Sequence, residues 1–152
     1  MELYNRLKLA SYFIASSYDE KGVGLSEKLD VGELEKSLNG GRKLKNGIRF
    51  SEDGEIGFAP RKTYKSGEMK PEDFAKDGLV LVTNKPEGAK RLAEVSSSKQ
   101  FKYSPRTWII EPTDEPIQSL SAVDSYWYGA WLNLNANCDG NDYGGCASEV
   151  LK

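Results

Sequence analysis

The segment from Ser125 to about Asn137 alternates between two kinds of side chain, and this alternation constrains the fold more than any other feature. One side carries apolar or small residues: Tyr126, Tyr128, Ala130, Leu132, Leu134 and Ala136. The other side carries Trp127, Gly129, Trp131, Asn133 and Asn135. Successive side chains of a strand point to opposite faces of a sheet, so a period of two over this length predicts one long strand with its leucine side on a core.

Shorter apolar runs predict further strands. Four runs have this character: residues 48–50, 56–58, 79–83 and 107–110. The first two flank a glycine-containing loop, which is typical of a β-hairpin, and each of the last two is followed by a segment with a proline that ends it. The beginning of the chain fits either a helix or a strand over residues 3–14. Near the other end, residues 146–151 can pair back after a turn at 139–142.

Two short helices complete the predicted elements. A capping box at Asp30 and Glu33 opens a helix through Leu38, and Pro71 opens a helical turn through Phe74 and Lys76. The many strands and few helices predict a mainly β fold, an OB-like small β-barrel with helical insertions. The length fits a single domain over residues 1–152, in which residues 1–47 match this barrel poorly.

The chain contains no histidine, and this absence excludes much chemistry. It removes the commonest general base, the Ser-His and Cys-His pairs and the usual zinc sites. Cys138 and Cys146 are too few ligands for a structural zinc ion; a disulfide between them is geometrically possible, but we expect free thiols. We therefore expect no metal, no cofactor and no enzyme activity.

No apolar run approaches the length of about 20 residues that a membrane-spanning helix requires. The N-terminus also lacks the basic start and apolar core of a secretion signal. We therefore expect a cytoplasmic protein, in the host cytoplasm if a phage encodes it, that does not associate with a membrane.

Charge is unevenly placed along the chain, although the formal net charge is only −2. Residues 41–70 carry eight Lys or Arg against four Asp or Glu, and residues 85–106 carry six against two, so each segment has a balance of +4. Residues 107–152 carry one against seven, a balance of −6. This pattern fits either a basic face that binds a polyanion or a mixed, solvated surface.

Two segments interleave basic and aromatic residues, as single-stranded nucleic acid requires for its phosphates and bases. The segment from 99 to 108 supplies Lys99, Phe101, Lys102, Tyr103 and Arg106, with Trp108 as a further ring. The segment from 61 to 65 supplies Arg61, Lys62, Tyr64 and Lys65. The alternative is that the aromatic side chains fill a core while the lysines face water.

A third candidate is the run of aromatic residues from Tyr126 to Trp131. Trp127 and Trp131 lie on the side of the predicted strand that also carries asparagines, and Gly129 between them leaves room for a base or a sugar. The alternative is a strand that is buried on both faces.

The C-terminal third, residues 99–152, resembles a family of phage single-stranded DNA-binding proteins with the OB fold. The resemblance rests on Pro105-Arg106, the run Trp108-Ile109-Ile110-Glu111 and the stretch Glu115-Pro116-Ile117, followed by the motifs at 128–133 and 144–147. Proteins of this family bind single-stranded DNA without sequence preference. They commonly end in an acidic tail that recruits partners, whereas this chain ends in Glu149-Val150-Leu151-Lys152.

The resemblance implies a sequence-independent single-stranded DNA-binding protein that acts in phage replication or recombination, with proteins of those processes as further partners. Two alternatives stay open. One is a phage or mobile-element inhibitor that binds a host protein through the acidic C-terminal third. The other is a carbohydrate-binding module that uses Trp127, Trp131 and the neighbouring asparagines.

Overall fold

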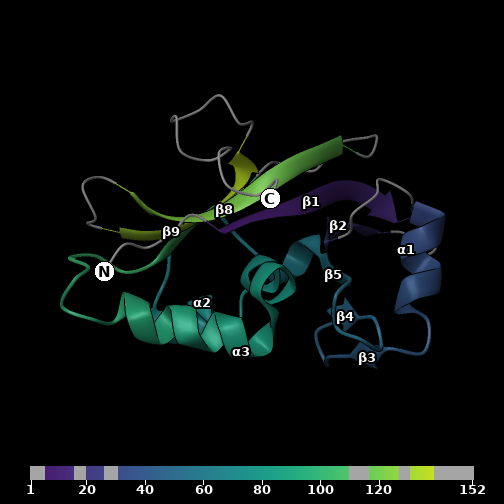
Figure 1. The fold of residues 1–152 in the computed structure, drawn as a ribbon, viewed down its shortest axis with the longest axis horizontal. Helices are drawn as coiled ribbons and strands as arrows, with labels where there is room; N and C mark the ends of the chain where they lie inside the picture. The colour runs from purple at the N-terminus through teal and green to yellow at the C-terminus, as the bar shows by residue number, and fades with distance from the viewer. Residues whose placement is uncertain (1–5, 16–19, 26–30, 110–116, 127–130, 139–152) are drawn as a thin grey trace.

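A computed structural model describes residues 6–15, 20–25, 31–109, 117–126 and 131–138 (Figure 1). The strands are β1 (Arg6–Ala15), β2 (Glu20–Leu25), β3 (Arg42–Lys43), β4 (Arg49–Phe50), β5 (Gly57–Pro60), β6 (Gly67–Glu68), β7 (Arg106–Trp108), β8 (Ile117–Tyr126) and β9 (Trp131–Cys138). The helices are α1 (Val31–Leu38), α2 (Pro71–Phe74) and α3 (Gly78–Ser96), with a 3-10 turn, η1, at Arg61–Thr63. This is a small mixed protein with mainly antiparallel strands and few helices, so the predicted mainly β character is confirmed.

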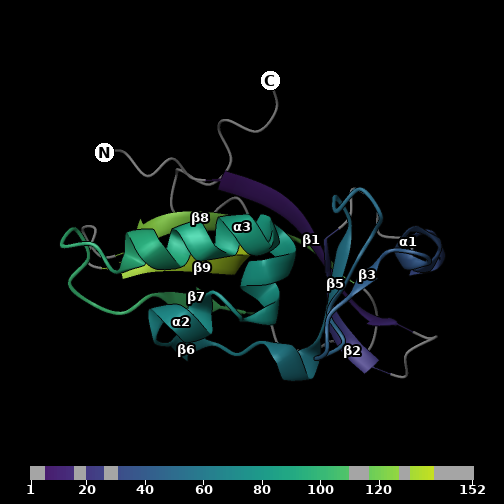
Figure 2. The ribbon, with the colours of Figure 1, turned by 90° about the horizontal axis from the view of Figure 1, so that it is seen from below.

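The nine described strands form a sheet in the order β3-β4-β5-β2-β1-β8-β9-β7-β6. All neighbours pair antiparallel except β7 and β9, which are parallel. The order begins at β3 and ends at β6 without closing, so the predicted OB-like barrel is not confirmed in the described part of the chain. Helices α2 and α3 cover one face of the sheet at its β8–β9–β7 end, whereas α1 lies near β2 and β5 (Figures 1 and 2).

Several local predictions are confirmed. β4 and β5 form the predicted hairpin, with Arg49 paired to Phe58 and Phe50 to Gly57. α1 ends at Leu38 as expected, and α2 begins at Pro71. The ambiguous N-terminal segment is a strand, since β1 pairs with both β2 and β8. The pairing predicted for residues 146–151 lies outside the described residues.

The strand predicted at residues 79–83 is wrong, because these residues form the first turns of α3. Leu79, Val80 and Val82 are all at most 1% exposed, so the run is buried on every side. An apolar run without a polar face carries no periodicity that separates a strand from a helix. The helix is favoured locally by Asp77, whose carboxylate accepts hydrogen bonds from the backbone N–H groups of Leu79 and Val80.

The single long strand predicted over residues 125–137 is also wrong. β8 ends at Tyr126, β9 begins at Trp131, and these two residues pair across an antiparallel hairpin. Both strands of a hairpin alternate with period two, so the sequence pattern does not reveal the reversal between them. Within β9 the predicted core side is confirmed, since Leu132, Leu134 and Ala136 are buried.

The core lies between the sheet and the helices. Leu132 and Leu134 of β9 pack in one apolar cluster with Leu79 and Val80 of α3 and with Phe74 of α2. Because Leu132 and Leu134 face the helices, the other face of β9 points away from them. That outer face carries the candidate site.

Candidate functional site

The outer face of β7 and β9 carries large polar and aromatic side chains. In β7, Thr107 is fully buried, so Arg106 and Trp108 point to the opposite face. The parallel pairing places Arg106 beside Asn133 and Trp108 beside Asn135. Trp131, two residues before Asn133, lies on the same face.

Three of these side chains meet two further ones in what we call the aromatic–arginine cluster: Arg106, Trp108 and Trp131 with Glu68 and Tyr103. The rings of Tyr103 and Trp131 are stacked, with centroids 4.4 Å apart and planes 21° from parallel. The guanidinium carbon of Arg106 lies 5.5 Å from the ring centroid of Trp108 and 5.7 Å from that of Trp131. The indole Nε1 of Trp131 donates a hydrogen bond of 2.7 Å to Oε1 of Glu68. The guanidinium therefore lies within cation–π distance of both indole rings.

The cluster is accessible to solvent. Trp108 is 51% exposed and Tyr103 is 40% exposed, and these are the exposed large hydrophobic residues in the described part of the chain. Such a surface combines flat apolar ring faces with charged groups and the partly exposed amide of Asn135, whereas Asn133 is 5% exposed. It can bind a ligand that has both an apolar face and hydrogen-bonding groups.

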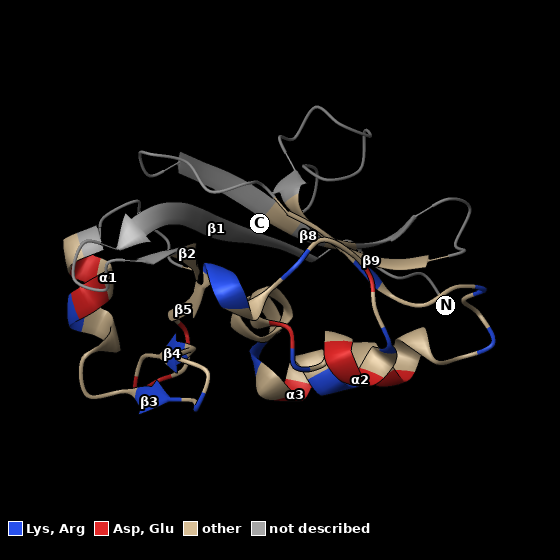
Figure 3. Cartoon of the chain, turned by 180° about the vertical axis from the view of Figure 1, so that it is seen from behind, with Lys and Arg blue, Asp and Glu red and all other residues tan. Residues whose placement is uncertain are grey.

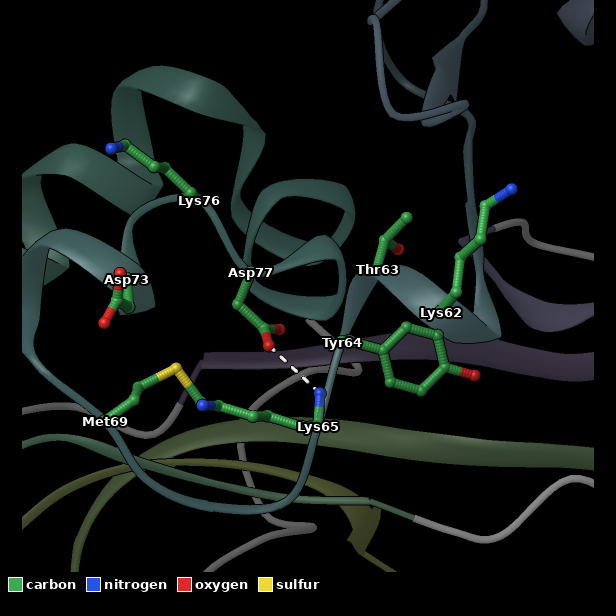
Figure 4. A pocket seen from close by; sticks show the side chains of 8 residues that line it. All are labelled: Lys62, Thr63, Tyr64, Lys65, Met69, Asp73, Lys76 and Asp77. Atoms are coloured by element: carbon green, nitrogen blue, oxygen red, sulfur yellow. Dashed lines mark hydrogen bonds between the residues drawn. The ribbon is translucent and has the colours of Figure 1, made fainter.

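A second feature is a pocket of about 330 Å³ between η1, the loop to β6, and the α2–α3 turn (Figure 4). It is lined by Lys62, Thr63, Tyr64, Lys65, Met69, Asp73, Lys76 and Asp77. Helix α3 begins directly against η1, because a Cβ at Gly78 would lie 2.1 Å from Oγ1 of Thr63. The three lysine side chains leave the pocket in different directions, so they do not converge on one anion (Figure 4).

Asp77 lies at the base of this pocket and is 6% exposed. Burial raises the pKa of its carboxyl from 3.8 to about 6, although hydrogen bonds from the backbone N–H groups of Lys65, Val80 and Leu79 act in the opposite direction. The carboxylate joins the start of α3 to the loop that precedes β6, since Oδ2 accepts from the N–H of Lys65 at 3.2 Å. This arrangement explains Asp77 as a capping and bridging residue.

Neither a family model nor a curated protein matches this chain in comparisons of its sequence. A solved structure described as "Accommodation of massive sequence variation in Nanoarchaeota by the C-type lectin fold" does match its fold. The alignment has a TM-score of 0.54 and 12% sequence identity, and it covers 90% of this chain and 71% of the other.

The chain is similar in fold to a C-type lectin-fold protein. At this identity the similarity concerns the fold alone, and it runs through nearly the whole chain rather than through the C-terminal third only. The comparison therefore finds a C-type lectin fold and not the OB fold that the resemblance to the phage family implies. The prediction of single-stranded DNA binding is wrong.

The placement of the predicted DNA-binding residues gives the physical reason. Tyr64 and Phe101 are 4% and 8% exposed, so neither ring offers a face on which a base can stack. Arg61 lies over the ring of Tyr64 at 5.2 Å and donates a hydrogen bond to the carbonyl oxygen of that residue. Tyr103 is exposed, but Trp131 occupies one of its faces.

The basic residues do not form one continuous track. Lys62, Lys65, Lys99 and Lys102 are exposed, and the two predicted segments do meet where β6 pairs with β7. However, the basic residues of β3 and β4 lie at the opposite end of the long axis from the loop that carries Lys99 and Lys102 (Figure 3). Acidic residues on α2 lie between them (Figure 3). In the part of the chain that the structure describes, a nucleic-acid strand therefore has no uninterrupted row of basic residues to follow.

Other site predictions lie beyond the described residues. Trp127 is among them, so its proposed role stays a prediction. The acidic residues of the C-terminal third either lie outside the described ranges or belong to β8 side chains that are not described. Binding of a host protein through that third therefore also stays a prediction.

Sequence reasoning missed Glu68 and gave Trp108 only a secondary place. The alternation Arg106-Thr107-Trp108 was a usable signal, because a buried threonine between them puts both long side chains on one face. No local signal points to Glu68, which reaches the cluster only through the pairing of β6 with β7. Within the described residues, no group of three or more Cys, Asp or Glu is placed to hold a metal ion, and no helix is long and apolar enough to cross a membrane.

Proposed function

We propose that this protein binds carbohydrate, without a catalytic step, on the outer face of β7 and β9. The observation that carries the proposal is the exposed indole of Trp108 beside the polar groups of the aromatic–arginine cluster. The similarity in fold to a C-type lectin-fold protein also supports the proposal, since lectins are by definition carbohydrate-binding proteins. This proposal replaces single-stranded DNA binding.

The chemistry of the face suits a sugar ring. A pyranose has a face of C–H groups and a rim of hydroxyls, so an aromatic ring can cover the first while polar side chains bond the second. Trp108 has the most exposed ring, and Asn135 lies beside it in register and is partly exposed. Glu68 supplies acceptors, and Arg106 supplies donors.

The expected affinity is modest. Covering about 80 Å² of an indole face contributes about 2 kcal/mol at 25 cal/mol per Å². Two or three neutral hydrogen bonds add about 1 kcal/mol each, and ordering the ligand offsets part of the sum. A single sugar should then bind with a Kd of about 1 mM, and an oligosaccharide that contacts more of the face should bind more tightly.

A glycan array followed by calorimetry on the best ligand tests this proposal. Trp108→Ala should weaken binding by about tenfold or more, because the stacking surface is lost. Lys90→Ala is the matched control, since Lys90 is exposed on α3 and the helix covers the other face of the sheet. Absence of binding to every glycan would contradict the proposal, and so would unchanged binding by a folded Trp108→Ala variant.

A further inference from the structure

We infer that the sugar bound on this face carries a carboxylate, which Arg106 recognises. The inference rests on the proposed function, and it concerns the chemical class of the ligand. It starts from the position of the guanidinium at the centre of the aromatic–arginine cluster, within 5.5 and 5.7 Å of two indole rings.

Both indole rings lie within cation–π distance of the guanidinium without a ligand, and such contacts limit its freedom. Arg106 is in β7, between β6 and β9, and its neighbours in register are Glu68 and Asn133. A long side chain that is already ordered loses little entropy when it binds, so the contact with an anion becomes more favourable. The planar fork of arginine has five N–H donors and matches the planar carboxylate in a bidentate pair. A ligand carboxylate can therefore add to the contacts that Arg106 already makes.

A second cation lies beside the cluster. The ammonium of Lys102 lies 5.2 Å from the ring centroid of Tyr103, which itself stacks on Trp131. Glu68 is the acidic member of the cluster, and one of its oxygens accepts the indole N–H of Trp131. Asp124 of β8 pairs in register with Asn133, and Asn133 with Arg106, so an anion is favoured here by the fork of Arg106 and the nearby Lys102 rather than by net charge.

A sugar acid fits these features better than a plain polyanion does. Its C–H face can cover Trp108 while its carboxylate reaches Arg106 from the same ring. A polyanion instead gains affinity by neutralising many charges along its length, and the basic residues of β3 and β4 lie at the far end of the molecule (Figure 3). The cluster is thus suited to one anionic group next to one apolar ring.

The test uses matched oligosaccharides of galacturonate, glucuronate and mannuronate, each as the free acid and as the neutral methyl ester. Calorimetry with the full chain should show that one acid binds about tenfold more tightly than its ester. Arg106→Gln should make the two affinities equal, and Arg106→Lys should keep only part of the preference because lysine lacks the fork. Trp108→Ala should weaken acid and ester by the same factor.

The outcomes separate the two proposals. If the ester binds as tightly as the acid, or if Arg106→Gln keeps the preference, this inference is overturned while carbohydrate binding stands. If neither form binds, the proposed function fails with it. Polyphosphate is the control for charge alone. If polyphosphate binds as tightly as the acidic oligosaccharide, the inference is overturned. A sulfated oligosaccharide preferred over the uronates would assign Arg106 to sulfate instead and would also overturn it. The comparison of acid and ester on the unmodified chain stands even if a variant fails to fold.

Discussion

Replacing Asp77 by asparagine tests how the buried carboxylate affects stability. Oδ1 of Asp77 accepts hydrogen bonds from the N–H groups of Leu79 at 3.0 Å and Val80 at 3.3 Å, while Oδ2 accepts from Lys65. Asparagine keeps one oxygen for the start of α3 and places an NH₂ group where Lys65 donates. The substitution removes the charge and one hydrogen bond, and it retains the shape of the side chain.

The pKa of Asp77 determines the sign and size of the effect. Burial raises the pKa from 3.8 to about 6, so the folded protein holds the proton more tightly than the unfolded chain. The ionised carboxylate therefore costs stability above about pH 6, and this cost disappears as the pH falls below 3.8. Two pKa units correspond to about 3 kcal/mol, of which about 2 kcal/mol falls between pH 7 and pH 4. As the pH falls from 7 to 4, the free energy of unfolding of the native chain should therefore rise by about 2 kcal/mol relative to that of Asp77→Asn.

Urea denaturation of both proteins at pH 4, 5, 6 and 7 measures the difference. The comparison is needed because other carboxylates act in the opposite direction; the pKa of Asp53, for example, is lowered by a hydrogen bond from Ser51. Asp73→Asn is the matched control, since Asp73 is an exposed carboxylate on the neighbouring α2. If the native chain and Asp77→Asn change with pH in parallel, the carboxylate does not titrate as this reasoning requires.

Three further substitutions have definite expected results. Lys85→Gly should raise the free energy of unfolding, measured by urea denaturation, by about 1 kcal/mol, because the relief of φ 61° and ψ 163° before Pro86 outweighs the loss of the exposed ion pair with Glu55; a loss of stability would contradict this. Leu134→Ala should lower it by about 2 to 5 kcal/mol, because Leu134 is 1% exposed; a loss below about 1 kcal/mol would place the side chain outside the core. Glu68→Gln keeps an acceptor for Trp131 and removes a like charge, so calorimetry should show tighter binding of the acidic sugar, and weaker binding would assign Glu68 to the ligand itself.

Elements that depend on neighbouring residues could be predicted. The β4–β5 hairpin follows from a glycine-containing loop between two apolar pairs, and α2 follows from Pro71 at its first position. The buried side of β9 follows from the alternation of Leu132, Leu134 and Ala136. In each case the decisive interaction lies within a few residues of the signal.

Elements that depend on burial could not be predicted in this way. The run at 79–83 is buried and carries no polar face, so its pattern does not separate helix from strand; its packing against α2, β5 and β9, together with the cap at Asp77, makes it helix. The reversal between β8 and β9 leaves the period of two intact on both sides. A local pattern therefore identifies the type of an element only where one face of that element stays polar, and it does not show where the chain reverses.

By itself, the sequence determined which side chains of β7 and β9 share a face, because alternation is a property of the extended backbone. It also determined that histidine-dependent chemistry is absent, since no histidine occurs. Only the tertiary structure decided that Trp131 stacks on Tyr103, that Arg106 lies near two indole rings, and that Glu68 accepts the indole N–H of Trp131. The physical reason is that these contacts follow from the pairing of β6, β7 and β9. These strands lie far apart in the sequence, and no local pattern indicates which of them pair.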